Sequence, residues 1–233
     1  MTEGFSRGDL DRAGLLAARR RRLAGTRLYF VCEAMPDPRA QASLLDAVLS
    51  GGADLIQLRD KLADDETLRR AAALFRRAAD RHGALFFLND RPELVEACGA
   101  DGVHVGQYDI AVADARAGAG GSALVGLSTH SPNQFDAALA AAGTARPDQL
   151  SVGPVWETPT KPGRAAAGLE LVRHAANAGG EAAWFAIGGI DRSNIDQVVA
   201  AGARRVVVVR ALREAADPES AARVLRAALE RAV

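Results

Sequence analysis

Lysine is rare in this chain. Lysine and arginine together number 29, yet the only lysines are Lys61 and Lys161. A compact ammonium and a planar guanidinium are not interchangeable where a point charge must approach a phosphate closely. The pattern favours a functional role for both lysines over chance retention at the surface.

Two aspartates, Asp90 and Asp109, are candidate metal ligands. Each lies in a polar stretch that follows a short apolar segment. Mg²⁺ is typically held by one or two carboxylates, while waters and phosphate oxygens complete the octahedron. Aspartate is also common as a helix N-cap, and Asp90 stands just before Pro92. The spacing alone leaves both interpretations open, and no Cys/His cluster indicates a transition metal.

Two further segments offer groups that bind anions. The stretch 153–163 contains three prolines and presents Thr158, Thr160 and Lys161, which indicates a substrate-binding lid or, alternatively, a plain connection. Gly188-Gly189 allows close backbone approach to a phosphate. Arg210 could add a cation there or be an exposed residue of the final helix.

No nucleophile–base pair can be identified from the sequence. His104, His130 and Cys32 are the candidates for such chemistry. Each stands without a visible partner, and lone histidines and cysteines usually have structural roles.

The elements that position these residues follow a repeated pattern. Glycines 52, 99 and 202 each stand where a helix ends before a short apolar strand. Their spacing fits units of about 25 residues, and eight such units need roughly 200. We expect strands at 28–31, 55–58, 85–88, 102–105, 124–127, 149–152, 183–187 and 205–209, with helices between them. The second helix should run from Asp64 or Asp65 to Gly83, and the fifth from Ser131 to Gly143.

The predicted fold is therefore a single-domain (β/α)8 TIM barrel over residues 27–233, with an open doubly wound sheet as the alternative. Residues 1–26 form a short N-terminal extension. Its arginine run, 19–22, is interpreted as part of a docked or frayed helix, with a functional basic arm as the alternative. In such a barrel the residues after each strand form the active site, and both lysines fall on that rim.

Composition excludes several classes of function. Acidic and basic residues both number 29, so the strongly basic balance of a nucleic-acid binder is missing. We find no apolar run long enough for a membrane span and no signal core. Two cysteines cannot form a disulfide framework, which favours a cytoplasmic protein. A homo-oligomer is compatible with the sequence.

Six ordered motifs resemble those of the thiamine-phosphate synthase family, over roughly residues 27–213. They are Gln57-Leu58-Arg59-Asp60-Lys61, Asn89-Asp90-Arg91, the stretch 102–107 with Asp109, Ser128, Thr158-Pro159-Thr160-Lys161-Pro162-Gly163, and Ile187-Gly188-Gly189-Ile190. Six motifs in order are far more specific than any one of them.

The resemblance implies the joining of 4-amino-5-hydroxymethyl-2-methylpyrimidine diphosphate to hydroxyethyl-methylthiazole phosphate, or its carboxylated form. Thiamine monophosphate and pyrophosphate would be the products. It implies that Asp90 and Asp109 hold Mg²⁺. It also implies that Gln57, Leu58, Arg59, Asp60, Lys61, Asn89, Ser128 and Lys161 bind the pyrimidine diphosphate. The thiazole phosphate would be held by Thr158, Pro159, Thr160, Gly188, Gly189, Val209 and Arg210, although the family more usually has a small hydroxylic residue at position 210.

Lys161, Arg59 and Ser128 are the expected catalytic residues. Cations suit the neutralisation of a departing diphosphate, and no general base is needed because the thiazole nitrogen attacks with its own lone pair. Two alternatives remain at this point. One is a thiazole tautomerase of the same barrel family, with His130 as proton carrier; the other is a non-catalytic protein that binds thiamine precursors.

Overall fold

Eight parallel strands close into a barrel in the computed structural model, which describes residues 12–158 and 165–231. The strands follow one another in sequence order, and β1 pairs with β8 to close the sheet. They are β1 (Leu28–Cys32), β2 (Leu55–Leu58), β3 (Leu85–Asn89), β4 (Gly102–Val105), β5 (Leu124–Thr129), β6 (Gln149–Val152), β7 (Ala183–Ile187) and β8 (Val206–Val208). The predicted barrel is confirmed, and the open sheet is wrong because β1 pairs with β8 and no edge strand remains.

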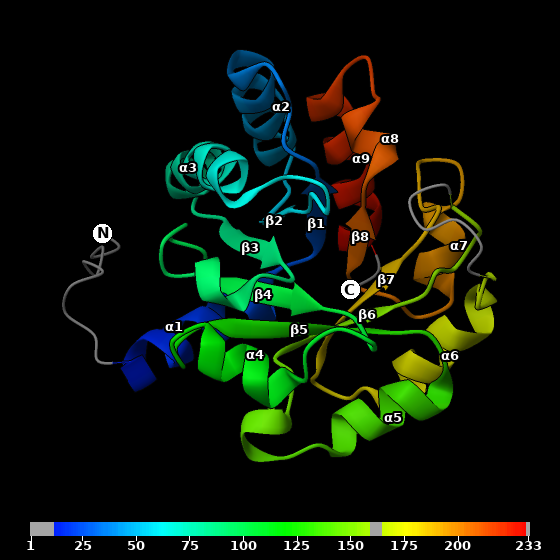
Figure 1. Ribbon diagram of the computed structural model, residues 1–233. Helices are drawn as coiled ribbons and strands as arrows, with labels where there is room; N and C mark the ends of the chain where they lie inside the picture. The colour runs from blue at the N-terminus through cyan, green and yellow to red at the C-terminus, as the bar shows by residue number, and fades with distance from the viewer. Residues whose placement is uncertain (1–11, 159–164, 232–233) are drawn as a thin grey trace, which may run out of the picture.

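Helices surround the strands (Figure 1). They are α1 (Arg12–Gly25), α2 (Pro38–Ser50), α3 (Asp65–His82), α4 (Val112–Gly118), α5 (Pro132–Ala140), α6 (Gly168–Ala178), α7 (Ile195–Ala200), α8 (Arg210–Arg213) and α9 (Pro218–Glu230), with 3₁₀ turns η1 (Pro92–Leu94) and η2 (Gly143–Ala145). Between β3 and β4 only η1 forms, so the strict alternation of strand and α-helix fails there. The 12 residues between these strands also include the turn at Asp90, which leaves room for one short turn.

Local signals set the helix ends. The Asp64 side chain accepts a hydrogen bond from Thr67 N at the start of α3, and Gly83 closes the helix in the left-handed conformation, as predicted. Ser131 caps α5 as predicted. However, α5 ends at Ala140 rather than Gly143, because the following segment is drawn into contact with the buried Arg116, which donates to Thr144 O and Arg146 O.

The barrel interior changes from apolar to polar along the strands. Side chains alternate between the interior and the helices, as strand geometry requires. Near the amino ends the interior is filled by a buried cluster that includes Leu55, Leu85, Phe87 and Phe185. Near the carboxyl ends polar side chains join the lining, among them Gln57, Asn89, His104, Ser128 and Ser151. This gradient places hydrogen-bonding groups at the rim where a ligand would enter.

Helix α1 lies across the end where the strands begin (Figure 1). Its Leu23 is 2% exposed and packs against the apolar cluster that fills the barrel near the amino ends of the strands. Arg19, inside the arginine run, is buried and pairs with Asp101 at 3.2 Å, while Arg20 pairs with Asp148 at 2.7 Å. These contacts support a docked helix rather than a free basic arm.

Asp101 anchors this end of the barrel. It is 2% exposed and also pairs with Arg76 at 2.8 Å, and its Oδ2 accepts from Phe86 N. Burial opposes ionisation of Asp101, but the charges of Arg76 and Arg19 outweigh it and lower its pKa. The ionised carboxylate thus stabilises the fold.

We predict that Asp101→Asn reduces the free energy of unfolding by about 3–5 kcal/mol, because it removes a buried negative charge that pairs with both Arg19 and Arg76. The loss is expected to be full above pH ~4, the ordinary aspartate range, and to shrink as the pH falls through the lowered pKa. Denaturant unfolding at several pH values measures it. Asp46→Ala, which breaks a half-exposed pair with Arg81, is the control and should cost less than ~1 kcal/mol. Equal losses for both variants would contradict the anchoring role.

Candidate functional site

Two carboxylates and a lysine meet at the rim of the barrel. Lys61 Nζ lies 3.1 Å from Asp90 Oδ2, and Asn89 Nδ2 donates to the same oxygen at 2.6 Å. Asp109 comes from the loop after β4, and its carboxyl group is hydrogen-bonded to that of Asp90. Four residues predicted from three separate motifs are therefore brought together.

Asp90 is held in an unusual backbone conformation. Among the described residues it is the one residue other than glycine in the left-handed region, with φ at 59°. Its backbone N donates to His104 O at 2.9 Å, which fixes the turn after β3. Left-handed backbone at a residue with a side chain costs free energy and is concentrated at functional sites.

Neither aspartate caps a helix. The N-cap residue of η1 is Arg91 and that of α4 is Ala111, and neither has a side-chain cap. The Asp109 carboxylate instead accepts from Gly106 N at 2.8 Å within its own loop. The interpretation of these aspartates as helix caps is therefore wrong.

The paired carboxylates repel one another. Burial raises the pKa of Asp90, the nearby Lys61 lowers it, and the charge of Asp109 together with the hydrogen bond between the two carboxyl groups raises it further, so that the net shift is upward. A divalent cation between them would remove this repulsion. Within the described residues no group of three or more Asp, Glu, His or Cys side chains could hold a metal, so phosphate oxygens and waters would have to complete the coordination.

A cavity of about 260 Å³ opens beside this cluster at the mouth of the barrel. Polar side chains from the strands line it, among them Gln57, Asn89, His104, Ser128 and Ser151. Arg59 lines it at the rim. Gln57 Nε2 donates to the hydroxyl of Tyr29, and burial raises the pKa of Tyr29 well above its ordinary value. The cavity therefore combines polar and apolar strand residues with the charged side chains of Arg59, Arg210, Arg213 and Glu33.

A larger cavity of about 780 Å³ adjoins the first one. Ser128, Ile187, Val207, Val209 and Arg210 line both cavities. The larger one is also lined by Thr158, Gly188, Gly189 and His130.

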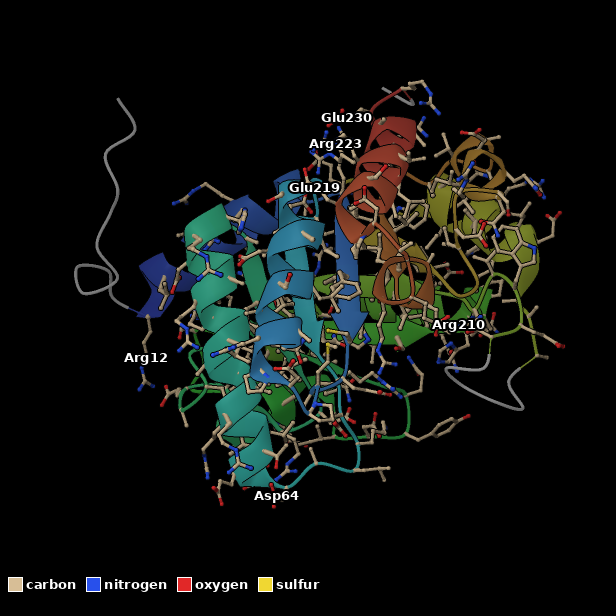
Figure 2. All side chains as sticks on the ribbon, turned by 90° about the horizontal axis from the view of Figure 1, so that it is seen from above. Arg12, Asp64, Arg210, Glu219, Arg223 and Glu230 are labelled. Atoms are coloured by element: carbon tan, nitrogen blue, oxygen red, sulfur yellow. The ribbon has the colours of Figure 1, made fainter. Side chains whose placement is uncertain are left out.

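Figure 2 shows Arg210 at the start of α8, apart from Glu219, Arg223 and Glu230, which lie along α9. The nearby Arg213 lies 3.4 Å from Glu33.

Gly188 and Gly189 have φ values of 106° and 68°. A Cβ at Gly188 would lie 2.5 Å from Pro154 Cβ, and Trp156 N donates to Gly188 O at 3.1 Å. The two glycines therefore let the loop after β7 pack against the segment after β6. The sequence predicts that these glycines let the backbone approach a ligand closely, and the structure shows that they also permit this packing between the two loops.

The remaining predicted site residues differ in their setting. Leu58 is 1% exposed within β2, and Asp60 Oδ1 accepts from Leu62 N and Ala63 N at 3.1 Å, so both support the loop that carries Arg59 and Lys61. Pro159, Thr160 and Lys161 lie outside the described residues. Burial raises the pKa of Cys32 to about 12, which makes it a poor nucleophile.

Sequence reasoning missed a buried polar chain. His104 Nε2 lies 2.9 Å from Ser128 Oγ, and His104 Nδ1 lies 3.0 Å from Gln149 Oε1. These partners are 24 and 45 residues away from His104 in the sequence, so local spacing could not pair them. The available signal was the polar residues at alternating, inward positions of otherwise apolar strands.

Comparisons with known proteins point to one family. A family model described as thiamine monophosphate synthase matches residues 28–212. A thiamine-phosphate synthase of Arthrobacter sp. (strain FB24) is 48% identical, covering 89% of this chain and 96% of its own. One of Thermus thermophilus is 52% identical, covering 86% and 95%. The solved thiamine phosphate pyrophosphorylase from Pyrococcus furiosus is 28% identical with a TM-score of 0.77, covering 92% of this chain and 98% of that one.

We predict that Asp90→Asn raises the melting temperature by a few degrees, about what ~1 kcal/mol produces in a domain of this size. It removes a charge that burial and Asp109 oppose, and asparagine tolerates positive φ. The partly exposed pair with Lys61 that is lost stabilises little. Because the pKa of Asp90 is raised in the folded state, the gain should be present at pH 7 and vanish below pH ~4, where both states are protonated.

Calorimetry without added divalent cations measures this change. Asp64→Asn, which replaces one good helix cap by another on α3, is the control and should leave the melting temperature almost unchanged. A lower melting temperature for Asp90→Asn would show that the two carboxylates do not repel one another.

Proposed function

The chain belongs to the thiamine monophosphate synthase family, and from that premise we propose how its residues make thiamine monophosphate. The transferase joins 4-amino-5-hydroxymethyl-2-methylpyrimidine diphosphate to hydroxyethyl-methylthiazole phosphate and releases pyrophosphate. With the carboxylated form of the thiazole, CO2 is released as well. The observation that carries the assignment of roles is the cluster of Asp90, Asp109 and Lys61 beside two adjoining cavities.

The reaction needs charge neutralisation more than proton transfer. The bond between the pyrimidinylmethyl carbon and a diphosphate oxygen breaks, and the electron pair leaves with pyrophosphate. The aminopyrimidine ring stabilises the resulting cation, which the thiazole nitrogen captures with its lone pair. Lys61 and Arg59 at the rim suit the leaving diphosphate. Lys161, by analogy with the family, would add a further cation.

The residues present fit a magnesium ion. Asp90 and Asp109 offer two carboxylates in mutual contact, and Mg²⁺ commonly takes one or two carboxylates with phosphate oxygens and waters. When bound, the ion would neutralise charge on the diphosphate as it leaves. The chain's own contribution is the turn at Asp90, which holds the two carboxylates together.

The two cavities suit the two substrates. The smaller cavity, with Gln57, Asn89, Ser128 and Arg59, would hold the pyrimidine diphosphate next to the carboxylates. The larger cavity, with Thr158, Gly188, Gly189, Val209 and Arg210, would hold the thiazole phosphate. Because the cavities share five lining residues, the two reacting atoms can meet at their junction, which supplies the proximity that a two-substrate reaction requires.

A cytoplasmic location is part of the proposal. Cys32 and Cys98 are both free, as a reducing compartment allows. No helix in the described part of the chain is long and apolar enough to cross a membrane.

We predict magnesium-dependent formation of thiamine monophosphate, with matching pyrophosphate release, from the two substrates. A chelator should abolish turnover and added Mg²⁺ should restore it. Asp90→Asn and Asp109→Asn should each lower turnover by about 100-fold or more, because each removes one of two anionic ligands. Steady-state assay of both products measures this. Absence of turnover by folded protein with both substrates and Mg²⁺ would overturn the proposed function, and turnover unaffected by the chelator would overturn the metal site.

We predict that Lys161→Ala lowers turnover by well over ~10-fold, because it removes a cation from the leaving group. Arg164→Ala, which removes another cation of the same segment, is the matched control and should have a small effect. Near-normal turnover of Lys161→Ala would remove Lys161 from the mechanism.

A further inference from the structure

A continuous chain of hydrogen bonds crosses the barrel interior beneath the smaller cavity. His104 on β4, Gly126 on β5 and Gln149 on β6 are register partners in neighbouring strands. Gln149 is fully buried and His104 is 8% exposed. The hydrogen bond between His104 Nδ1 and Gln149 Oε1 links β4 to β6 by passing over Gly126 of β5.

Gly126 makes this crossing possible. A Cβ at this position would lie 2.4 Å from Gln149 Oε1 and 2.5 Å from His104 Nδ1, closer than such atoms can approach. Its φ is not in the positive range, so the backbone itself does not call for glycine. The space above Gly126 is instead occupied by the hydrogen bond between its two neighbours.

The chain of bonds has one consistent direction. Gln149 Nε2 donates to Ser151 Oγ at 3.0 Å, which turns Oε1 toward His104. An amide oxygen only accepts, so Nδ1 of His104 must carry the proton. In the neutral ring Nε2 is then an acceptor, and the Ser128 hydroxyl donates to it across 2.9 Å. The lone pairs of Ser128 Oγ are left for the cavity.

We propose that Gln149 is a positioning residue that, by fixing the Nδ1–H tautomer of His104, makes Ser128 a hydrogen-bond acceptor for the exocyclic amino group of the pyrimidine substrate. The inference rests on the proposed function for the identity of that substrate. It assigns Ser128 to the pyrimidine end and not to the diphosphate, because a diphosphate oxygen requires a donor.

The chemistry gives this orientation a catalytic effect. As the bond to the diphosphate breaks, positive charge spreads from the methylene carbon onto the amino group of the ring. A hydrogen bond from that amino group to Ser128 Oγ strengthens as the charge develops, so it stabilises the transition state more than the bound substrate. A hydroxyl turned the other way would present its proton to this charge. This hydrogen bond therefore affects kcat rather than KM for the pyrimidine diphosphate.

The first test reads the tautomer directly, without turnover. Nitrogen-15 NMR of histidine-labelled protein, at a pH where the imidazole is neutral, should show His104 protonated at Nδ1 and not at Nε2. Gln149→Met removes the acceptor, and Gly126→Ala displaces it without removing a polar group. Both variants should shift His104 toward the Nε2–H form. An Nε2–H tautomer in the unaltered protein, or a tautomer that neither variant changes, would overturn the inference.

The second test is kinetic. Gln149→Met should lower kcat about 10- to 100-fold, the effect of losing one hydrogen bond to a charged group, with KM for the pyrimidine diphosphate within about twofold. Combined with Ser128→Ala, it should add no further loss, because both act through the same bond. If the losses in kcat of the two single variants multiplied in the double variant, the result would count against the inference. A raised KM with normal kcat for Gln149→Met would also count against it.

Thr129→Val is the matched control. It removes another buried hydrogen bond of this region, from Thr129 Oγ1 to Ser151 O at 3.1 Å, and should leave both the tautomer and kcat unchanged. Failure of the unaltered protein to form thiamine monophosphate would refute the proposed function, whereas normal turnover with an unmoved tautomer would refute this inference alone.

Discussion

Closure of eight parallel strands is the constraint on which the rest of the structure depends. It sends every carboxyl end to one rim, so that loops distant in sequence deliver Lys61, Asp90 and Asp109 to one place. It also gives each strand an inner face with a period of two. Apolar side chains fill the amino half of the interior, where Leu23 of α1 packs against them. Polar ones are left for the carboxyl half, where a ligand can satisfy them.

At the rim, the arrangement of charged residues lowers the stability of the fold. Asp90 occupies a backbone conformation that few side chains favour and faces a second carboxylate. Such an arrangement persists only because the surrounding barrel fixes it, through the bond from Asp90 N to His104 O. At the end of the barrel where the strands begin, charge stabilises the fold instead, because Asp101 pairs with Arg19 and Arg76. Function and stability thus occupy opposite ends of one barrel.

Much of this architecture can be predicted from sequence because buried parallel strands and helix caps leave local signals. The predicted bounds of β2, β4, β6 and β7 match the structure. The glycines at 52, 99 and 202 do precede β2, β4 and β8, two and four units apart. What could not be predicted depends on tertiary contact. Arg116 captures the segment after α5, and His104 finds partners on two other strands. No local pattern encodes such meetings.

The packed lower half of the barrel has a consequence for the passage of molecules. Phe87 and Phe185 are fully buried, Tyr29 is 1% exposed, and Leu23 lies beneath the interior, so in the described part of the chain the barrel is a cup and not a tube. Two substrates and two products must all use the one opening at the rim. A molecule seated in the larger cavity would obstruct the smaller one at their shared wall, which favours a fixed order of arrival and departure.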